Sequence, residues 1–230
     1  MTTGTVGDSL SARLATLPAA SPFDFDLSQR RALRLDLSAG NPTLRSLRTD
    51  DPVAFSAFIE HSLRAAGADY GWGGYGENRT LYGMSPLFDA SDEPRTLHLG
   101  VDLWTAAGTP VHAVLDGHIH SFQDNARFGD YGPTIILEHR AAGEPFWMLY
   151  GHLARRSLAA LSVGQHLRAG TRIGWLGVPE ENLGWPPHLH VQVIRDLQGQ
   201  AGDYPGVCRA SQATEWLRRC PDPNLLLRIR

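Results

Sequence analysis

Apolar and polar side chains alternate along two segments in the second half of the chain. In residues 97–104 (LHLGVDLW), apolar side chains occupy every second position, and His98 and Asp102 lie between them. Residues 188–194 (HLHVQVI) repeat this pattern with two histidines and a glutamine. Because successive side chains of an extended strand point to opposite faces, each segment is predicted to be a strand with one buried face and one polar face.

Short apolar runs separated by turns continue through the same half of the chain. Regular turn spacing with no helix between the runs is typical of antiparallel sheets, which can leave one face open as a groove. The predicted fold class is therefore mainly β, with one or more antiparallel sheets forming an open groove, plus an N-terminal helix and a short C-terminal helix. The remaining predicted strands lie at residues 111–114, 118–122, 134–138, 146–150 and 171–175, with two shorter ones at residues 23–27 and 33–37.

The N-terminal helix is predicted over residues 53–66. Residues 49–52 (TDDP) offer a capping side chain and an early proline, apolar residues then recur at helical spacing, and Gly67 follows the last of them. We interpret its apolar stripe as packing on the β domain. The C-terminal helix is predicted over residues 211–219.

Composition narrows the class of protein. A chain of 230 residues suffices for one larger domain or two small ones, and 24 glycines and 15 prolines are typical of a turn-rich β protein. The net charge of −3 gives no basic surface for nucleic acid. No apolar run approaches the roughly 18 residues that a membrane span needs. We therefore expect neither a nucleic acid nor a membrane as a partner, and the oligomeric state stays open.

Two features bear on the cellular compartment. The N-terminal residues carry no basic cluster followed by a long apolar stretch, which is unlike a secretory signal peptide. Cys208 and Cys220 are too few for a disulfide framework and favour free thiols in a reducing compartment, although a bridge between them stays open. Both features predict a cytoplasmic location; secretion would require a signal outside this sequence.

Three segments carry side chains that fit one zinc site: residues 98–102, 150–153 and 188–190. Two imidazoles and one carboxylate, with one coordination position left for water, form the ligand set of a hydrolytic zinc centre. Gly100, between His98 and Asp102, leaves room for an ion close to the backbone. The first hypothesis is a metallohydrolase in which the remaining histidines transfer protons.

The same segments resemble the M23 family of zinc metallopeptidases, the lysostaphin-type or LytM-type peptidoglycan endopeptidases. HLGVD (98–102) resembles that family's HxxxD element, YGHL (150–153) its YxHL element, and PPHLHVQV (186–193) its GPHLHFE element. GTPVHAVLDG (108–117) resembles a strand and turn of the family. The motifs occur in the family's order over residues 83–196.

The resemblance implies a role for each matched residue. His98, Asp102 and His190 would be the zinc ligands, and His152 and His188 the catalytic histidines. The implied activity is cleavage of a peptide bond, in peptidoglycan or a related peptide or amide, by a zinc-activated water. One histidine would accept a proton and the other would stabilise the developing oxyanion, with the assignment between them open.

The chain departs from the family pattern at two places. Trp185-Pro186-Pro187 replaces the usual Gly-Pro, and Val191-Gln192 replaces the usual Phe-Glu. Losing that glutamate removes a hydrogen-bond acceptor for a metal ligand, but the Gln192 amide oxygen is an alternative acceptor.

Three residues are candidates for lining the substrate groove. Asn78 and Arg79 end a glycine- and aromatic-rich segment, residues 71–79, in which Arg79 is placed to hold a substrate carboxylate. The competing interpretation of this segment is an irregular connector packed by its own aromatic rings. Tyr150, two residues before His152, would share its face on a strand and serve for packing or orientation.

The expected organisation has three parts. Residues 1–82 form an N-terminal extension whose helix packs on the catalytic domain, residues 83–200 form the β zinc-hydrolase domain, and residues 201–230 form a tail with a short helix. Residues 220–224 (CPDPN) weakly resemble a segment of large fusion proteins that join a kinase-like domain, a peptidase-like domain and an aminotransferase.

Other functions remain as alternatives. The weak resemblance favours an intracellular amide hydrolase that acts on a small amino-acid or amine conjugate. A non-catalytic metal-binding or interaction domain would keep the metal without turnover. A non-haem iron oxygenase also uses two histidines and a carboxylate, but it would leave His152 and His188 unexplained.

Overall fold

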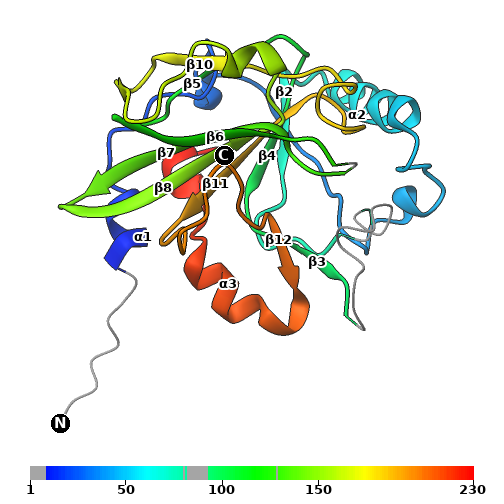
Figure 1. Cartoon of the computed structure of the whole chain (residues 1–230). Coiled ribbons are helices and arrows are strands. Elements are labelled where there is room, and N and C mark those ends of the chain that lie inside the picture. Colours follow the sequence, from blue (N-terminus) through cyan, green and yellow to red (C-terminus); the bar gives the residue numbers. More distant parts are fainter. Residues whose placement is uncertain (1–8, 80, 82–92, 128) are drawn as a thin grey trace.

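The structure is a computed structural model that describes residues 9–79, 81, 93–127 and 129–230. Within these residues one large sheet forms the centre of the molecule (Figure 1). Its strands, in spatial order, are β1 (Ala32–Arg34), β2 (Tyr70–Gly73), β4 (Val101–Trp104), β11 (His188–Ile194), β8 (Glu144–Gly151), β7 (Gly132–Ala141), β6 (Gly117–Asn125) and β9 (His166–Leu167). The pairs are antiparallel except for β1 with β2, which is parallel.

Two small antiparallel sheets and several short helices surround the large sheet. The small sheets pair β5 (Pro110–His112) with β10 (Arg172–Trp175), and β3 (Arg95–His98) with β12 (Val207–Arg209). The α-helices are α1 (Ser9–Leu14), α2 (Pro52–Ala66), α3 (Ala213–Arg219) and α4 (Asn224–Leu227). The 3-10 helices are η1 (Leu27–Gln29), η2 (Pro42–Arg45), η4 (Arg155–Leu158) and η5 (Ala210–Gln212). The predicted mainly β, antiparallel fold class is confirmed.

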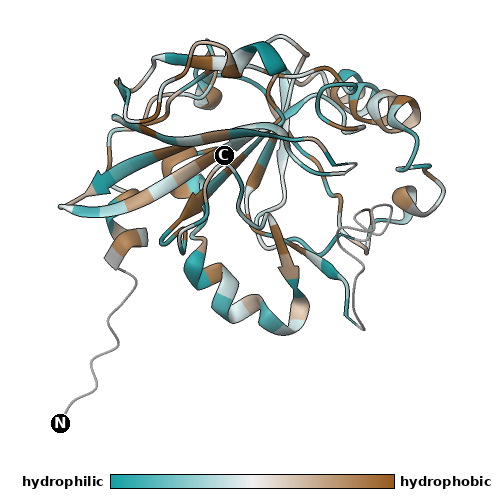
Figure 2. Ribbon diagram, in the orientation of Figure 1, coloured by the Kyte–Doolittle hydropathy of each residue, from teal (hydrophilic) through white to brown (hydrophobic). Residues whose placement is uncertain are grey.

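The helix predicted over residues 53–66 is α2. The Asp51 side chain accepts hydrogen bonds from the Val53 and Ala54 amides, and Pro52 occupies the first turn, where a missing N–H costs nothing. Gly67 ends the helix with a φ of 58°, a left-handed conformation that glycine adopts without strain. Figure 2 shows apolar and hydrophilic residues interspersed along α2, as expected of a helix with one packed side.

The predicted strand at residues 23–27 is wrong. Ser21 folds this segment into a bend, because its hydroxyl accepts a hydrogen bond from the Phe23 amide and donates one to the Phe25 carbonyl. Such local side-chain bonds offer the backbone an alternative to a sheet ladder. Of the predicted strand at residues 33–37, only the first residues belong to β1.

The predicted strand at residues 97–104 is two strands. β3 ends at His98, β4 begins at Val101, and the two belong to different sheets. The chain crosses from one part of the core to another at this break, since Leu97 and Leu99 pack in one buried cluster and Val101 in another. The crossing leaves His98 beside the first residues of β4, and therefore beside Asp102.

None of the described helices combines the length and the apolar character that crossing a membrane requires.

Candidate metal centre and active site

Two neighbouring strands and the end of a third bring three side chains together. β11 pairs with β4 in a register that places His190 directly opposite Asp102. Nδ1 of His190 lies 3.0 Å from Oδ1 of Asp102 and 3.0 Å from Nε2 of His98, and the latter two atoms are 3.4 Å apart. Three atoms with lone pairs therefore converge on one point, although His190 lies 92 residues after His98 in the sequence.

The spacing of these atoms fits a tetrahedral zinc ion. Ligand atoms about 2.0–2.1 Å from a tetrahedral metal lie about 3.3 Å from one another. The three observed separations, 3.0, 3.0 and 3.4 Å, lie close to that value. Among the histidine, cysteine and acidic side chains of the described residues, His98, Asp102 and His190 form a group whose ligand atoms lie close enough together to hold a metal ion.

The ionisation states suit metal binding as well. Burial, reinforced by the charge of Arg79, lowers the pKa of His98 to about 4, so this imidazole is neutral at pH 7. Burial opposes ionisation of Asp102, but its contacts with His98 and the charge of Arg79 outweigh burial and hold the pKa of this carboxyl well below its usual value. A neutral imidazole and an ionised carboxylate are the forms that coordinate zinc.

Each of the three side chains is held by a second contact. Nδ1 of His98 lies 3.0 Å from the Gly74 carbonyl, which leaves Nε2 for the metal. Nε2 of His190 lies 3.0 Å from Oε1 of Gln192, and Arg79 donates to Oδ2 of Asp102 at 2.6 Å. Partners of this kind fix the tautomer and the orientation of metal ligands. The acceptor role predicted for Gln192 is confirmed by this contact.

Gly100 serves the site differently from the prediction. A Cβ atom at this position would lie 2.5 Å from Cε1 of His190 and 2.7 Å from the Val191 carbonyl oxygen. The missing side chain therefore leaves room for the His190 ring on the adjacent strand, rather than for an ion.

Two further histidines lie beside the trio. The ring centroids of His152 and His188 are 4.0 Å apart, and Nε2 of His188 is 3.9 Å from Oδ1 of Asp102. Burial lowers the pKa of both imidazoles, and that of His152 falls well below its usual value. Nδ1 of His188 lies 2.7 Å from the Pro186 carbonyl oxygen. Since a carbonyl only accepts, the His188 proton sits on Nδ1 and its Nε2 carries a lone pair facing the site.

All five predicted metal and catalytic residues line one cavity of about 240 Å³. Arg79 also lines it, and its guanidinium contacts Glu77 and Asp102. Asn78 is exposed and is not part of the cavity wall, so its predicted place in the groove is not seen.

The prediction that Tyr150 shares a face with His152 is wrong. Tyr150 is fully buried in the core, where its hydroxyl accepts a hydrogen bond from the Val114 amide. His152 follows the last residue of β8 and has a φ of 63°, which breaks the strand alternation and turns its side chain into the cavity. The interpretation of Tyr150 as a packing residue is the one that agrees with the structure.

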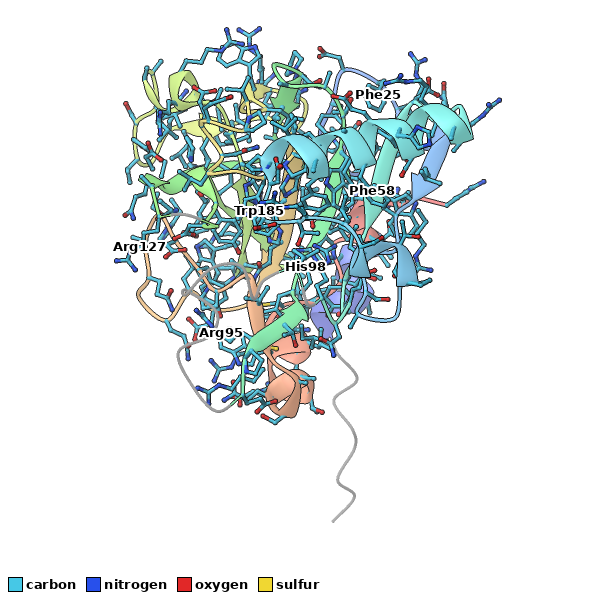
Figure 3. The ribbon with its side chains drawn as sticks, turned by 90° about the vertical axis from the view of Figure 1, so that its right-hand side faces the viewer. Phe25, Phe58, Arg95, His98, Arg127 and Trp185 are labelled. Carbon is cyan, nitrogen blue, oxygen red and sulfur yellow. The ribbon has the colours of Figure 1, made fainter. Side chains whose placement is uncertain are left out.

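Several cavity residues were not predicted from the sequence. Tyr131 places its ring centroid 5.1 Å from that of His190 and 5.7 Å from that of His152. Trp185 lies 6.3 Å from His152, and Phe55 on α2 lies 6.4 Å from Trp185 (Figure 3 labels Trp185 and His98). Trp185 directly precedes Pro186, which replaces the family's glycine, and this departure was a visible signal, whereas no local pattern marks Tyr131.

The fold and the site define a mainly antiparallel β domain with a two-histidine, one-aspartate metal centre and an adjacent histidine pair. Residues 96–203 match the model of Peptidase family M23, so the chain contains an M23 peptidase domain, as its motifs predicted. Zinc is the cofactor of this family, and the trio fits it, so the zinc prediction is confirmed.

Two relatives are similar to part of the chain. The glycyl-glycine endopeptidase ALE-1 of Staphylococcus capitis is 32% identical over 95 residues, which is 41% of this chain and 24% of that protein. Lysostaphin of Staphylococcus simulans is 31% identical over 99 residues, which is 42% of this chain and 18% of that protein. The chain therefore matches less than a quarter of the length of either relative.

Solved structures of peptidases are also similar to it. The catalytic domain of lysostaphin from Staphylococcus simulans is 23% identical with a TM-score of 0.42, covering 70% of this chain and 96% of that one. A zinc-containing peptidase from Vibrio cholerae is 27% identical with a TM-score of 0.34, covering 43% of this chain and 27% of that one.

Proposed function

We propose that this protein is a zinc-dependent endopeptidase that hydrolyses a peptide bond in peptidoglycan or in a related peptide or amide. The observation that carries the proposal is the convergence of His98, Asp102 and His190 beside the His152–His188 pair in one cavity. The name of one relative, glycyl-glycine endopeptidase ALE-1, supports a peptide substrate.

Three side chains are assigned as the zinc ligands. His98, Asp102 and His190 would hold zinc, and their outer contacts keep each ligand atom aimed at one point. Zinc bound there would supply Lewis-acid chemistry, which lowers the pKa of a water molecule and polarises a carbonyl oxygen.

The histidine pair carries the proton chemistry. The Nδ1 contact of His188 with the Pro186 carbonyl leaves its Nε2 as a proton acceptor on the metal side, so His188 is assigned as the general base. His152 lies against it and is assigned to donate an N–H hydrogen bond to the carbonyl oxygen as negative charge develops there, while His188 passes the proton that it accepted to the leaving amine. Both imidazoles are buried, and an aromatic ring lies against each of them.

The test combines metal content with turnover. Zinc-loaded protein is incubated with purified peptidoglycan, pentaglycine and a mixed peptide library, and new amino groups are quantified. The His152→Ala and His188→Ala variants are expected to keep one zinc per chain and lose about 10²–10⁴-fold in turnover. His190→Ala is expected to lose the zinc.

Two results would overturn the proposal. One is a wild-type protein that binds one zinc yet hydrolyses none of the three substrates, which would favour the metal-binding alternative. The other is a His188→Ala variant with wild-type turnover. The cytoplasmic location expected from the N-terminal sequence stays a prediction, and so does the choice between wall and intracellular substrates.

A further inference from the structure

The active-site cavity has one continuous apolar part. It consists of side chains that belong to a single buried cluster: Leu37, Phe55, Leu81, Trp104, Trp185 and Val207. We call this part the apolar wall. The rest of the lining includes the polar side chains Arg95, Arg127, Asp130, Gln200 and Asp203.

Two rings of the apolar wall lie against the catalytic His188. The Trp104 ring stacks on His188, with centroids 5.7 Å apart and an interplanar angle of 21°. Trp185 lies 6.4 Å from His188 in an edge-on arrangement, and its indole N–H donates to the Gly129 carbonyl, which fixes the ring. A group bound against these two rings is thus adjacent to the reacting atoms.

The outer part of this wall comes from the N-terminal segment. Phe55, on the buried side of α2, meets Trp185 edge-on at 6.4 Å, and Leu37 completes the wall from the segment after β1. In Figure 3, Trp185 lies beneath α2, close to His98, whereas Arg95 and Arg127 lie farther from the helix. Leu37 and Phe55 both precede residues 96–203, so this part of the wall lies outside the matched M23 domain.

We propose that the apolar wall is a specificity subsite for a large apolar side chain on the residue next to the scissile bond. The inference rests on the proposed function and names the substrate class within it. Cavities that bind small ligands combine apolar lining with a few polar groups that fix orientation, as this cavity does. Leucine or phenylalanine buried there gains an interaction that glycine lacks, and an aspartate side chain is excluded by the cost of losing its water.

The first test uses the zinc-loaded wild-type protein and peptides of the form acetyl-Gly-Gly-X-Gly-Gly-amide, with X as glycine, leucine, phenylalanine or aspartate. Cleavage sites are mapped by mass spectrometry. The expected kcat/KM for leucine and phenylalanine is about 10–100-fold above that for glycine, with cleavage at one of the two bonds of X. Equal or faster cleavage of the glycine or aspartate peptide would overturn the proposal.

A pair of matched variants places the subsite on α2. Phe55→Leu shortens a side chain of the apolar wall and enlarges the cavity there. It is expected to change the ratio of kcat/KM between the phenylalanine and leucine peptides by about 3–10-fold. Phe58→Leu makes the same chemical change on the same helix, at a partly buried residue that does not line the cavity, and is expected to leave that ratio within about twofold. An equal change in both variants would contradict the assignment.

A binding measurement separates this inference from the proposed function. N-acetyl-phenylalaninamide and N-acetyl-glycinamide are titrated into the protein while backbone amide NMR signals near Trp185 are followed. Saturable binding of the phenylalanine amide, weakened by Phe55→Leu and not by Phe58→Leu, supports the subsite even if no peptide is hydrolysed. Hydrolysis of peptides without any preference for apolar X, together with no binding of the amide, would remove the subsite and leave the peptidase intact.

Discussion

Arg79 and Asp102 form a buried ion pair in which Nη1 of the arginine lies 2.6 Å from Oδ2 of the aspartate, with both side chains 3% exposed. The other carboxylate oxygen, Oδ1, faces His98 and His190. Arg79 is held in turn by Glu77, whose carboxylate lies 2.6 Å from Nε. The ion pair thereby reserves one oxygen of Asp102 for the metal and fixes the plane of the carboxylate.

Replacing Arg79 should weaken zinc binding. Arg79→Met leaves the Asp102 carboxylate buried without its cationic partner, and loss of such an outer contact typically lowers metal affinity by about 10–100-fold. In the metal-free protein, the uncompensated charge should also lower the free energy of unfolding by about 3–5 kcal/mol. Arg79→Lys keeps the charge but cannot bridge Glu77 and Asp102 at once, so we expect an intermediate affinity.

Competition with a chelator measures the zinc affinity of these variants directly. Arg48→Met is the matched control, because Arg48 is largely exposed and its nearest acidic partner, Asp50, is 3.7 Å away on the surface. An Arg79→Met protein that binds zinc within twofold of wild type would show that Asp102 is oriented by other contacts.

Adding one methyl group at Gly100 should displace a zinc ligand. The Cβ of Gly100→Ala would lie within 2.7 Å of the His190 ring and of the Val191 carbonyl oxygen, and the latter belongs to a strand that cannot easily move. We expect about a tenfold or greater loss of zinc affinity and a lower melting temperature. Gly40→Ala is the control, since its Cβ would meet only the Ser38 hydroxyl at 3.5 Å. Wild-type zinc affinity in Gly100→Ala would mean that β4 and β11 can separate without cost.

The parts of the site that the sequence predicted are those governed by local periodicity. Alternation along residues 188–194 correctly placed His188 and His190 on the face opposite the buried leucine and valines. Alternation also brought His98 and Asp102 to one side, although the chain breaks between them. Sequence alone left open which strands pair, because register depends on contacts between segments about 90 residues apart.

The predictions that failed depended on conformation or on distant packing. Tyr150 and His152 were expected on one face, but the left-handed backbone at His152 has no sequence signature, since histidine rarely adopts it. Arg79 was predicted to line the groove, and it does, but its ion pair with Asp102 could not be predicted because this contact depends on tertiary packing. The contact of Phe55 with Trp185 was not predicted for the same reason. The apolar stripe of its helix predicts that Phe55 is buried, but not which residues it packs against.

Restoring the family's glutamate at position 192 should cost stability while preserving zinc. Oε1 of Gln192 accepts from His190, and its Nε2 donates to the Pro205 carbonyl at 3.0 Å and to Sγ of Cys220 at 3.3 Å. In Gln192→Glu, an oxygen replaces this donor and faces a carbonyl, so a buried acceptor is left unpaired.

The expected loss in the free energy of unfolding for Gln192→Glu is about 1–3 kcal/mol, read from urea denaturation with zinc present. Zinc affinity should stay near that of wild type, because one oxygen still accepts from His190. Gln198→Glu, at an exposed turn, is the control. A Gln192→Glu protein more stable than wild type would show that the Pro205 segment rearranges to supply a donor.

His139, away from the metal site, should make the protein lose stability in mild acid. Burial lowers the pKa of this imidazole to about 4, while Nδ1 donates to the Asp116 carbonyl and the ring packs on Phe146. The unfolded chain binds a proton at His139 below a pH of about 6.5, whereas the folded protein resists protonation until about pH 4. The contribution of His139 to the free energy of unfolding is therefore complete above pH 6.5 and is lost as the pH falls from 6.5 to 4, by about 3 kcal/mol in total.

In His139→Gln, the curve of unfolding free energy against pH should be flatter than that of wild type between pH 6.5 and 4, measured by urea denaturation with the other histidines unchanged. A His139→Gln curve that runs parallel to that of wild type would mean that protonation of His139 does not destabilise the fold.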